Sequence, residues 1–288
     1  MPNDFELLFY AAFLGQIYLI SWFLPNRIMA RLRFILDNYP AAEYPKLYPL
    51  PEEVYRGRYR IFEIANRVLF VLGFAVLALV LTIDPVKISS DGYISEAWPA
   101  FYGMLQMLPL AGLEILACGQ LRLMRRLHTS TRRRAELRRR GLLSSVPGAV
   151  LAIAGVFFFT AAAVDFLWIG EVESWEKRRS LWLALANLIM VVSGVISLRM
   201  ARKNPYQPFE ERARMISAQL TSVAYVSIAV SAIMLFSVAD EIFGLDHLDA
   251  AVLSLYMQAI VALSVGNVMR LVRPENMNFE VYREAPSA

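Results

Sequence analysis

Seven apolar stretches, each about as long as a bilayer is thick, dominate this chain. A helix needs about 20 largely apolar residues to cross a membrane. The stretches are apolar on all sides rather than along one stripe, which is typical of helices that face lipid or a bundle core. We predict an all-α integral membrane protein with about seven spans, at residues 5–24, 62–83, 98–118, 146–168, 181–198, 216–238 and 250–269.

The overall composition agrees with a membrane protein. The 288 residues are 57% hydrophobic and 19% charged, whereas soluble domains are typically about 45–50% apolar and about 25% charged. Cys118 is the only cysteine, so an intrachain disulfide is excluded. The first residues lack the positive charge of a cleavable signal peptide, so we expect the first apolar segment to be retained.

The basic residues predict the orientation. Of the 29 Lys and Arg residues, 25 fall on one side of the predicted spans, and positive charge next to spans stays in the cytoplasm. The N-terminus is then outside and the C-terminus inside. The cytoplasmic parts are a Tyr/Pro-rich loop (26–61), an Arg-rich loop (119–145) and the tail (270–288).

After the first span the chain reads as three successive helical hairpins. The outward spans end near Asp84, Asp165 and Asp240, and each return span ends in an Arg-x-x-Arg sequence. Triplication of one hairpin explains this pattern. The positive-inside bias explains it as well, because that bias alone places arginines at every return, so both explanations stay open.

The stretch "LRLMRRLHTSTRRRAELRRRG" follows the third span directly. Its position predicts a topology anchor whose arginines contact anionic lipid headgroups. Nucleic acid is not an expected partner, because no aromatic residues alternate with the arginines to stack on bases. The six expected lipid contacts are Arg132, Arg133, Arg134, Arg138, Arg139 and Arg140.

Two opposite charges are expected at one depth within the membrane. Arg67 lies 17 residues before Asp84, and Glu114 lies 17 residues after Ala97. In an antiparallel hairpin that turns between Asp84 and Ala97, these offsets place both about 25 Å from the turn. We therefore expect an Arg67–Glu114 ion pair, either as a structural pair or as a proton- or ion-sensing pair.

Each return span also contains one amide: Gln106, Asn187 and Gln258. Amides in spans commonly hydrogen-bond between helices. The alternative is that the three converge on one polar site. The two arrangements differ in a simple way, because a shared site brings the amides together and helix packing keeps them in separate contacts.

The loop "NYPAAEYPKLYPLP" contains Tyr39, Tyr44 and Tyr48, each followed by a proline. Proline holds such a segment extended, and tyrosine offers rigid contact area. The loop is expected either to cover a groove of its own protein or to dock a protein partner at the cytoplasmic face.

The outer segment "ADEIFGLDHLD" provides Asp240, Glu241, Asp246 and Asp249. Carboxylates bind Ca²⁺ or Mg²⁺, but this spacing is not an EF-hand, and Asp246 or Asp249 also suits a helix N-cap. They are weak metal candidates, and neither a metal nor a cofactor is predicted.

The sequence offers little support for an enzyme, since HExxH, GxSxG and Walker motifs are absent. Two functions remain. The first is a non-catalytic membrane protein that acts through lipid and protein contacts, as a complex subunit or scaffold. The second is a small-solute or ion transporter or channel with a site between its helices. The high Arg and Ala content suggests a bacterial inner membrane.

Overall fold

The protein is described by a computed structural model that covers residues 4–83, 94–95, 97–128, 145–168, 179–201 and 204–283. Within these ranges the chain is helical apart from short connections, and no strand occurs in them. Six helices are long and apolar enough to cross a membrane, and one further helix has a shorter apolar stretch, Leu181–Ile196. The all-α prediction is confirmed, and the helices are compatible with a multi-pass membrane protein.

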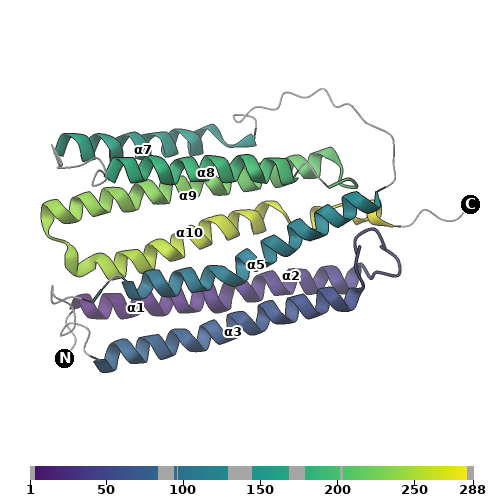
Figure 1. The fold of residues 1–288 in the computed structure, drawn as a ribbon, viewed down its shortest axis with the longest axis horizontal. Helices are drawn as coiled ribbons and strands as arrows, with labels where there is room; N and C mark the ends of the chain where they lie inside the picture. Colours follow the sequence, from purple (N-terminus) through teal and green to yellow (C-terminus); the bar gives the residue numbers. More distant parts are fainter. Residues whose placement is uncertain are drawn as a thin grey trace, which may run out of the picture.

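The long helices run back and forth along the long axis of the molecule (Figure 1). They are α1 (Asp4–Tyr18), α2 (Leu24–Asn38), α3 (Glu52–Ile83), α5 (Ala97–Leu127), α7 (Gly148–Trp168), α8 (Arg179–Ala201), α9 (Phe209–Phe243) and α10 (Asp249–Leu271). A π-helical turn, Leu19–Phe23, joins α1 to α2 without a break.

Helix α10 lies in the middle of the bundle and contacts α9 on one side and α1 and α5 on the other (Figure 1). Helices α7 and α8 pack against α9, and α3 packs against α5, α1 and α2. We call the end of the bundle where α2 and α10 finish and α3 begins the basic end. The opposite end, where α9 turns into α10, is the acidic end.

The connection between the first two spans is shorter than predicted. Helix α2 extends to Asn38 and α3 begins at Glu52, so most of the expected loop 26–61 is helical. The prediction was wrong here because apolarity falls where the arginines begin, whereas Arg, Leu, Met and Ala all favour a helix. Only residues 39–51 form the connection.

The π-helical turn coincides with a proline. Pro25 has no N–H, so the carbonyl of Ser21 loses its usual α-helical donor. The turn just before the proline is wider than an α-helical turn, because the Leu24 N–H bonds the Leu19 carbonyl, five residues earlier. The helix thus continues past the proline, and Ser21 in the widened turn is only 2% exposed.

The largest buried apolar cluster surrounds α1. Phe9, Phe13 and Ile17 pack against Val80 of α3 and Tyr102 of α5. In contrast, large apolar side chains on the outer helices are mostly exposed, including Val71, Ile115, Phe159 and Leu188. Soluble monomers rarely expose so much contiguous apolar surface, whereas lipid covers such a surface in a membrane.

Candidate functional site

A large cavity lies between five helices at the basic end. Its volume is about 740 Å³, and α2, α3, α5, α9 and α10 all contribute to its walls. This volume falls within the about 300–1,000 Å³ that is typical of small-molecule sites. Most of the lining is apolar, including Leu32, Met107, Leu110, Val265 and Met269. The cavity is therefore suited to a molecule with a hydrocarbon body.

Three charged side chains interrupt this apolar lining. Arg31 comes from α2, Arg58 from α3 and Glu114 from α5. Arg31 Nη1 donates to the Val272 carbonyl at 3.0 Å. Within the described ranges, none of the three side chains forms an ion pair.

The three charges lie at different depths below the basic end. Arg58 is six residues into α3 and Arg31 is seven residues before the end of α2, which corresponds to about 9–11 Å at 1.5 Å per residue. Glu114 is 13 residues before the end of α5, which corresponds to about 20 Å. The cavity thus carries positive charge nearer the basic end and negative charge deeper along α5.

The α9–α10 wall of the cavity is polar but uncharged. Ser222 Oγ donates to the Ser264 carbonyl at 3.1 Å, and Asn267 Nδ2 donates to Ser222 Oγ at 3.1 Å. Gln219 also lines the cavity, and its Oε1 is buried without a hydrogen-bond partner among the described residues. A buried acceptor of this kind is stabilised when a ligand donates to it.

The predicted Arg67–Glu114 ion pair is wrong. Arg67 pairs with Glu63, one turn away on its own helix, and Glu63 also accepts from Arg33 at 2.7 Å. The Arg67 side chain is 63% exposed, whereas Glu114 lines the cavity. The offsets along the hairpin set only the depth of the two residues, and the rotation of each helix points them to different surroundings.

Gln106 belongs to a buried hydrogen-bond network that links α1, the π-helical turn, α3, α5 and α10. Gln106 Nε2 donates to Ser21 Oγ at 2.8 Å and to the Gln16 carbonyl at 3.3 Å. Gln16 Nε2 donates to Gln106 Oε1 at 3.0 Å and to the Pro99 carbonyl at 3.2 Å. Ser254 Oγ donates to Gln16 Oε1 at 2.7 Å. Both amides therefore use all their N–H groups within the protein.

The network continues to a backbone carbonyl of α3. Tyr102 Oη donates to the Leu69 carbonyl at 2.9 Å and lies 3.2 Å from Ser21 Oγ. Because the Tyr102 proton is used on Leu69, Ser21 is the donor in the second contact. The result is one directed chain from Gln106 through Ser21 and Tyr102 to Leu69, and such chains strengthen each of their bonds.

The other two predicted amides lie in different surroundings. Gln258 Nε2 donates to the Ala12 carbonyl of α1 at 2.9 Å, next to the Gln16 network. Asn187 joins α8 to α9, because its Oδ1 accepts from Ser227. The structure thus brings Gln106 and Gln258 to the same helix, α1, but keeps Asn187 in a separate contact. None of the three lines the cavity.

Sequence reasoning missed Gln16, which is the centre of the network and is fully buried. The available signal was simple: Gln16 is the only amide in the predicted span 5–24. The cavity residues Arg31 and Arg58 were also missed. They were assigned to a loop, whereas Arg31 lies in the middle of α2 and Arg58 lies in the second turn of α3.

The tyrosines of the loop pack on their own chain. Residues 39–51 and 272–283 together form what we call the cap over the basic end. Tyr39 stacks on Phe279 with ring centroids 4.0 Å apart, and Tyr44 and Tyr48 are at most 9% exposed. The loop therefore covers its own protein, with Tyr44 and Tyr48 buried there and Tyr39 half-buried.

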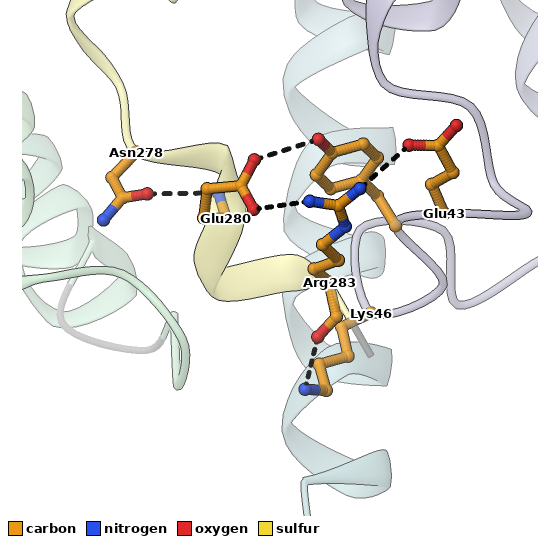
Figure 2. Close-up of polar contacts among 6 residues, drawn as sticks. Glu43, Lys46, Asn278, Glu280 and Arg283 are labelled. Carbon is orange, nitrogen blue, oxygen red and sulfur yellow. Dashed lines mark hydrogen bonds and ion pairs between the residues drawn. The ribbon is translucent and has the colours of Figure 1, made fainter. Parts of the chain in front are cut away.

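Polar contacts lock the two parts of the cap together (Figure 2). Lys46 Nζ donates to the Arg283 carbonyl at 2.7 Å, and Tyr44 Oη donates to Glu280 Oε1 at 3.0 Å. The Arg283 guanidinium lies between Glu280 at 3.2 Å and Glu43 at 3.4 Å. Gln120 of α5 also donates to the Leu47 carbonyl at 3.0 Å, which attaches the cap to the cavity wall.

Burial raises the pKa of several cap tyrosines. Tyr282 has a pKa raised to about 12 because burial disfavours the tyrosinate, although a hydrogen bond from Asn204 Nδ2 at 2.9 Å partly offsets this effect. The pKa of Tyr44 is raised by burial and by its bond to the Glu280 carboxylate. The pKa of Tyr48 is also raised by burial. The hydroxyls are therefore protonated at neutral pH.

At the acidic end, three of the four predicted acids lie together. Carboxylate oxygens of Asp240, Asp246 and Asp249 are all within 4.8 Å of one another, and Glu241 is not part of this group. Asp246 is exposed, and exposed carboxylates commonly gather without a metal. The six arginines expected to contact lipid, Arg132 to Arg134 and Arg138 to Arg140, lie outside the described residues.

Similarity to known proteins adds no assignment to this site. The cavity, its three charges and the cap therefore have to be interpreted from their own chemistry. No protein-family model, no curated protein and no solved structure matches this chain.

Proposed function

We propose that this protein is a multi-pass membrane protein that binds a small amphipathic molecule between its helices, as a transporter or ligand sensor does. The observation that carries the proposal is the cavity of about 740 Å³ with Arg31, Arg58 and Glu114 in its walls. Charged side chains at membrane depth are costly and usually functional. A largely apolar pocket with a few converging polar groups is the usual form of a ligand site.

We further propose that the basic end faces the cytoplasm and that the N-terminus is outside. The support is the charge distribution, since 25 of the 29 Lys and Arg residues fall on this side of the predicted spans. A bacterial inner membrane agrees with this arrangement. The cavity then lies in the cytoplasmic half of the bilayer, next to the cap.

A second candidate is a non-catalytic subunit or scaffold that acts through lipid and protein contacts. One observation favours it: Gln16 and Gln106 use all their N–H groups within the protein. The N–H groups of these two buried amides are therefore satisfied without any ligand. Of the three loop tyrosines, Tyr44 and Tyr48 are buried against their own chain, which leaves Tyr39 as the more accessible ring for a partner.

The test is native mass spectrometry of the full chain, extracted gently with its own lipids. Ligand binding predicts a retained small mass on the intact protein. The variant Ala111→Phe, which fills the cavity wall, is expected to lose that mass. Ala75→Phe is the matched control, because Ala75 is exposed on α3 and does not line the cavity. A heteromeric complex with an empty cavity would favour the second candidate instead.

A further inference from the structure

The charged side chains of the cavity indicate the chemical class of the ligand, whereas the volume of the cavity indicates only its size. The two guanidinium groups come from α2 and α3, and the carboxylate comes from α5. Arg58 lies over the Tyr55 ring, 5.9 Å from its centroid, and forms no ion pair with a described residue. An unpaired charge in an apolar wall is costly unless a partner of the opposite sign is supplied. Here the lining offers both signs, with Arg31 and Arg58 half-buried and Glu114 exposed.

A ligand with a single charge leaves part of this arrangement uncompensated. An anionic amphiphile pairs with Arg31 and Arg58 but places its charge near Glu114. A lipophilic cation pairs with Glu114 but faces the two arginines. A zwitterionic headgroup satisfies both walls, because its phosphate accepts from guanidinium groups, with bidentate geometry, and its ammonium donates to a carboxylate.

The uncharged groups of the cavity lining also suit a zwitterionic headgroup whose ammonium lies near Glu114. An ammonium group has three N–H donors, and Glu114 takes only part of them. The buried Gln219 Oε1, which has no partner among the described residues, is a further acceptor in the same cavity. The apolar lining, with Met107, Leu110 and Val265, is suited to a hydrocarbon chain.

We infer that the cavity binds a single-chain zwitterionic membrane lipid of the lysophosphatidylethanolamine class. Its phosphate lies at Arg31 and Arg58, its ammonium at Glu114 and its chain among the apolar side chains. This inference rests on the proposed function, since it names the ligand of the same cavity. One chain agrees with a volume of about 740 Å³, which is within the range for small ligands.

The experiment measures binding of three probes with hydrocarbon chains of the same length to the full-length protein in nanodiscs. The probes are lysophosphatidylethanolamine, lysophosphatidic acid and a primary alkylammonium. The zwitterionic probe is expected to bind at least about tenfold more tightly than either other probe, since each charged hydrogen bond is worth about 1.5–3 kcal/mol.

Two variants separate the headgroup contacts. Glu114→Gln is expected to weaken the zwitterionic probe about tenfold or more while leaving lysophosphatidic acid unchanged or tighter. Arg58→Gln is expected to weaken both phosphate-containing probes. Arg67→Gln is the control, because Arg67 is exposed, pairs with Glu63 and does not line the cavity. The ratio between probes within one variant does not depend on the fraction of protein that folds.

The outcomes separate this inference from the proposed function. Tightest binding of the anionic or cationic probe, or an unchanged probe ratio in Glu114→Gln, overturns the zwitterionic assignment and leaves ligand binding in place. No binding of any probe, together with no retained mass that Ala111→Phe removes, overturns both.

Discussion

Gln16 and Gln106 form reciprocal hydrogen bonds across the interface of α1 and α5. Gln16 Nε2 donates to Gln106 Oε1 at 3.0 Å, and Gln106 Nε2 donates back to the Gln16 carbonyl at 3.3 Å. Both side chains are at most 1% exposed. In a medium without water, every unpaired polar group costs free energy, so each amide stabilises the fold by satisfying the hydrogen-bonding groups of the other.

We expect Gln16→Leu to lower the free energy of unfolding by about 1–3 kcal/mol, because it leaves Gln106 and Ser254 with unpaired buried atoms. Asn187→Leu breaks one contact between α8 and α9 and is expected to cost about 0.6 kcal/mol, at most about 1.7. Both are measured by unfolding in mixed micelles with increasing dodecyl sulfate. Equal effects of the two variants would contradict the central role of Gln16.

Gly73 allows α3 to approach Tyr102 and α1 closely. A Cβ atom at this position would lie 2.7 Å from Ile17 Cγ1 and 2.8 Å from Tyr102 Cζ. We therefore expect Gly73→Ala to destabilise the protein by about 1–3 kcal/mol through overpacking. The same micelle titration measures it.

Gly57→Ala on the same helix is the control, because nothing lies within 4 Å of its added Cβ. It is expected to leave stability unchanged or to raise it by up to about 1 kcal/mol through helix propensity. A Gly73→Ala protein as stable as this control would show that α3 and α5 do not approach as described.

The cap is expected to lose stability at alkaline pH. The pKa of Tyr282 is raised to about 12 by burial, above the value of about 10 for an exposed tyrosine. A raised tyrosine pKa means that folding favours the protonated form. Its stabilising contribution is therefore complete below pH about 10 and is lost as the pH rises through about 12.

The measurement is a tyrosinate absorbance titration of the native protein and of Tyr282→Phe. The variant is expected to lack one titration step near pH 12. At neutral pH it loses the bond from Asn204, at a cost of about 0.5–1.5 kcal/mol. Titration of all tyrosines near pH 10 would contradict the buried position of Tyr282.

The orientation is tested with single cysteines in a Cys118→Ser background. Ser95 is exposed near the start of α5 at the acidic end, and Glu275 is exposed after α10 at the basic end. With the N-terminus outside, a membrane-impermeant maleimide is expected to label Ser95→Cys in intact cells. Glu275→Cys is then labelled only after permeabilisation. The reverse pattern would place the basic end outside.

Some of the cavity could be anticipated from the sequence and some could not. Glu114 stands out as an acid in an apolar stretch, and its position in α5 was predicted correctly. The predicted partner of Glu114, Arg67, was wrong. An offset of 17 residues gives only the depth of a residue and not the side of the helix on which it lies. The same difficulty applies to Gln106, Asn187 and Gln258, whose neighbours come from distant segments.

The sequence by itself determined that the chain is helical and built from six to seven long apolar segments. The reason is local: a segment of about 20 apolar residues cannot leave its peptide groups unpaired in lipid, and a helix pairs them within the segment. Only the tertiary structure decided that Gln16 is the centre of the core, that the tyrosine loop covers its own chain and that a charged cavity lies at the basic end. These features depend on the rotation and splay of each helix against its neighbours, which packing between distant side chains sets.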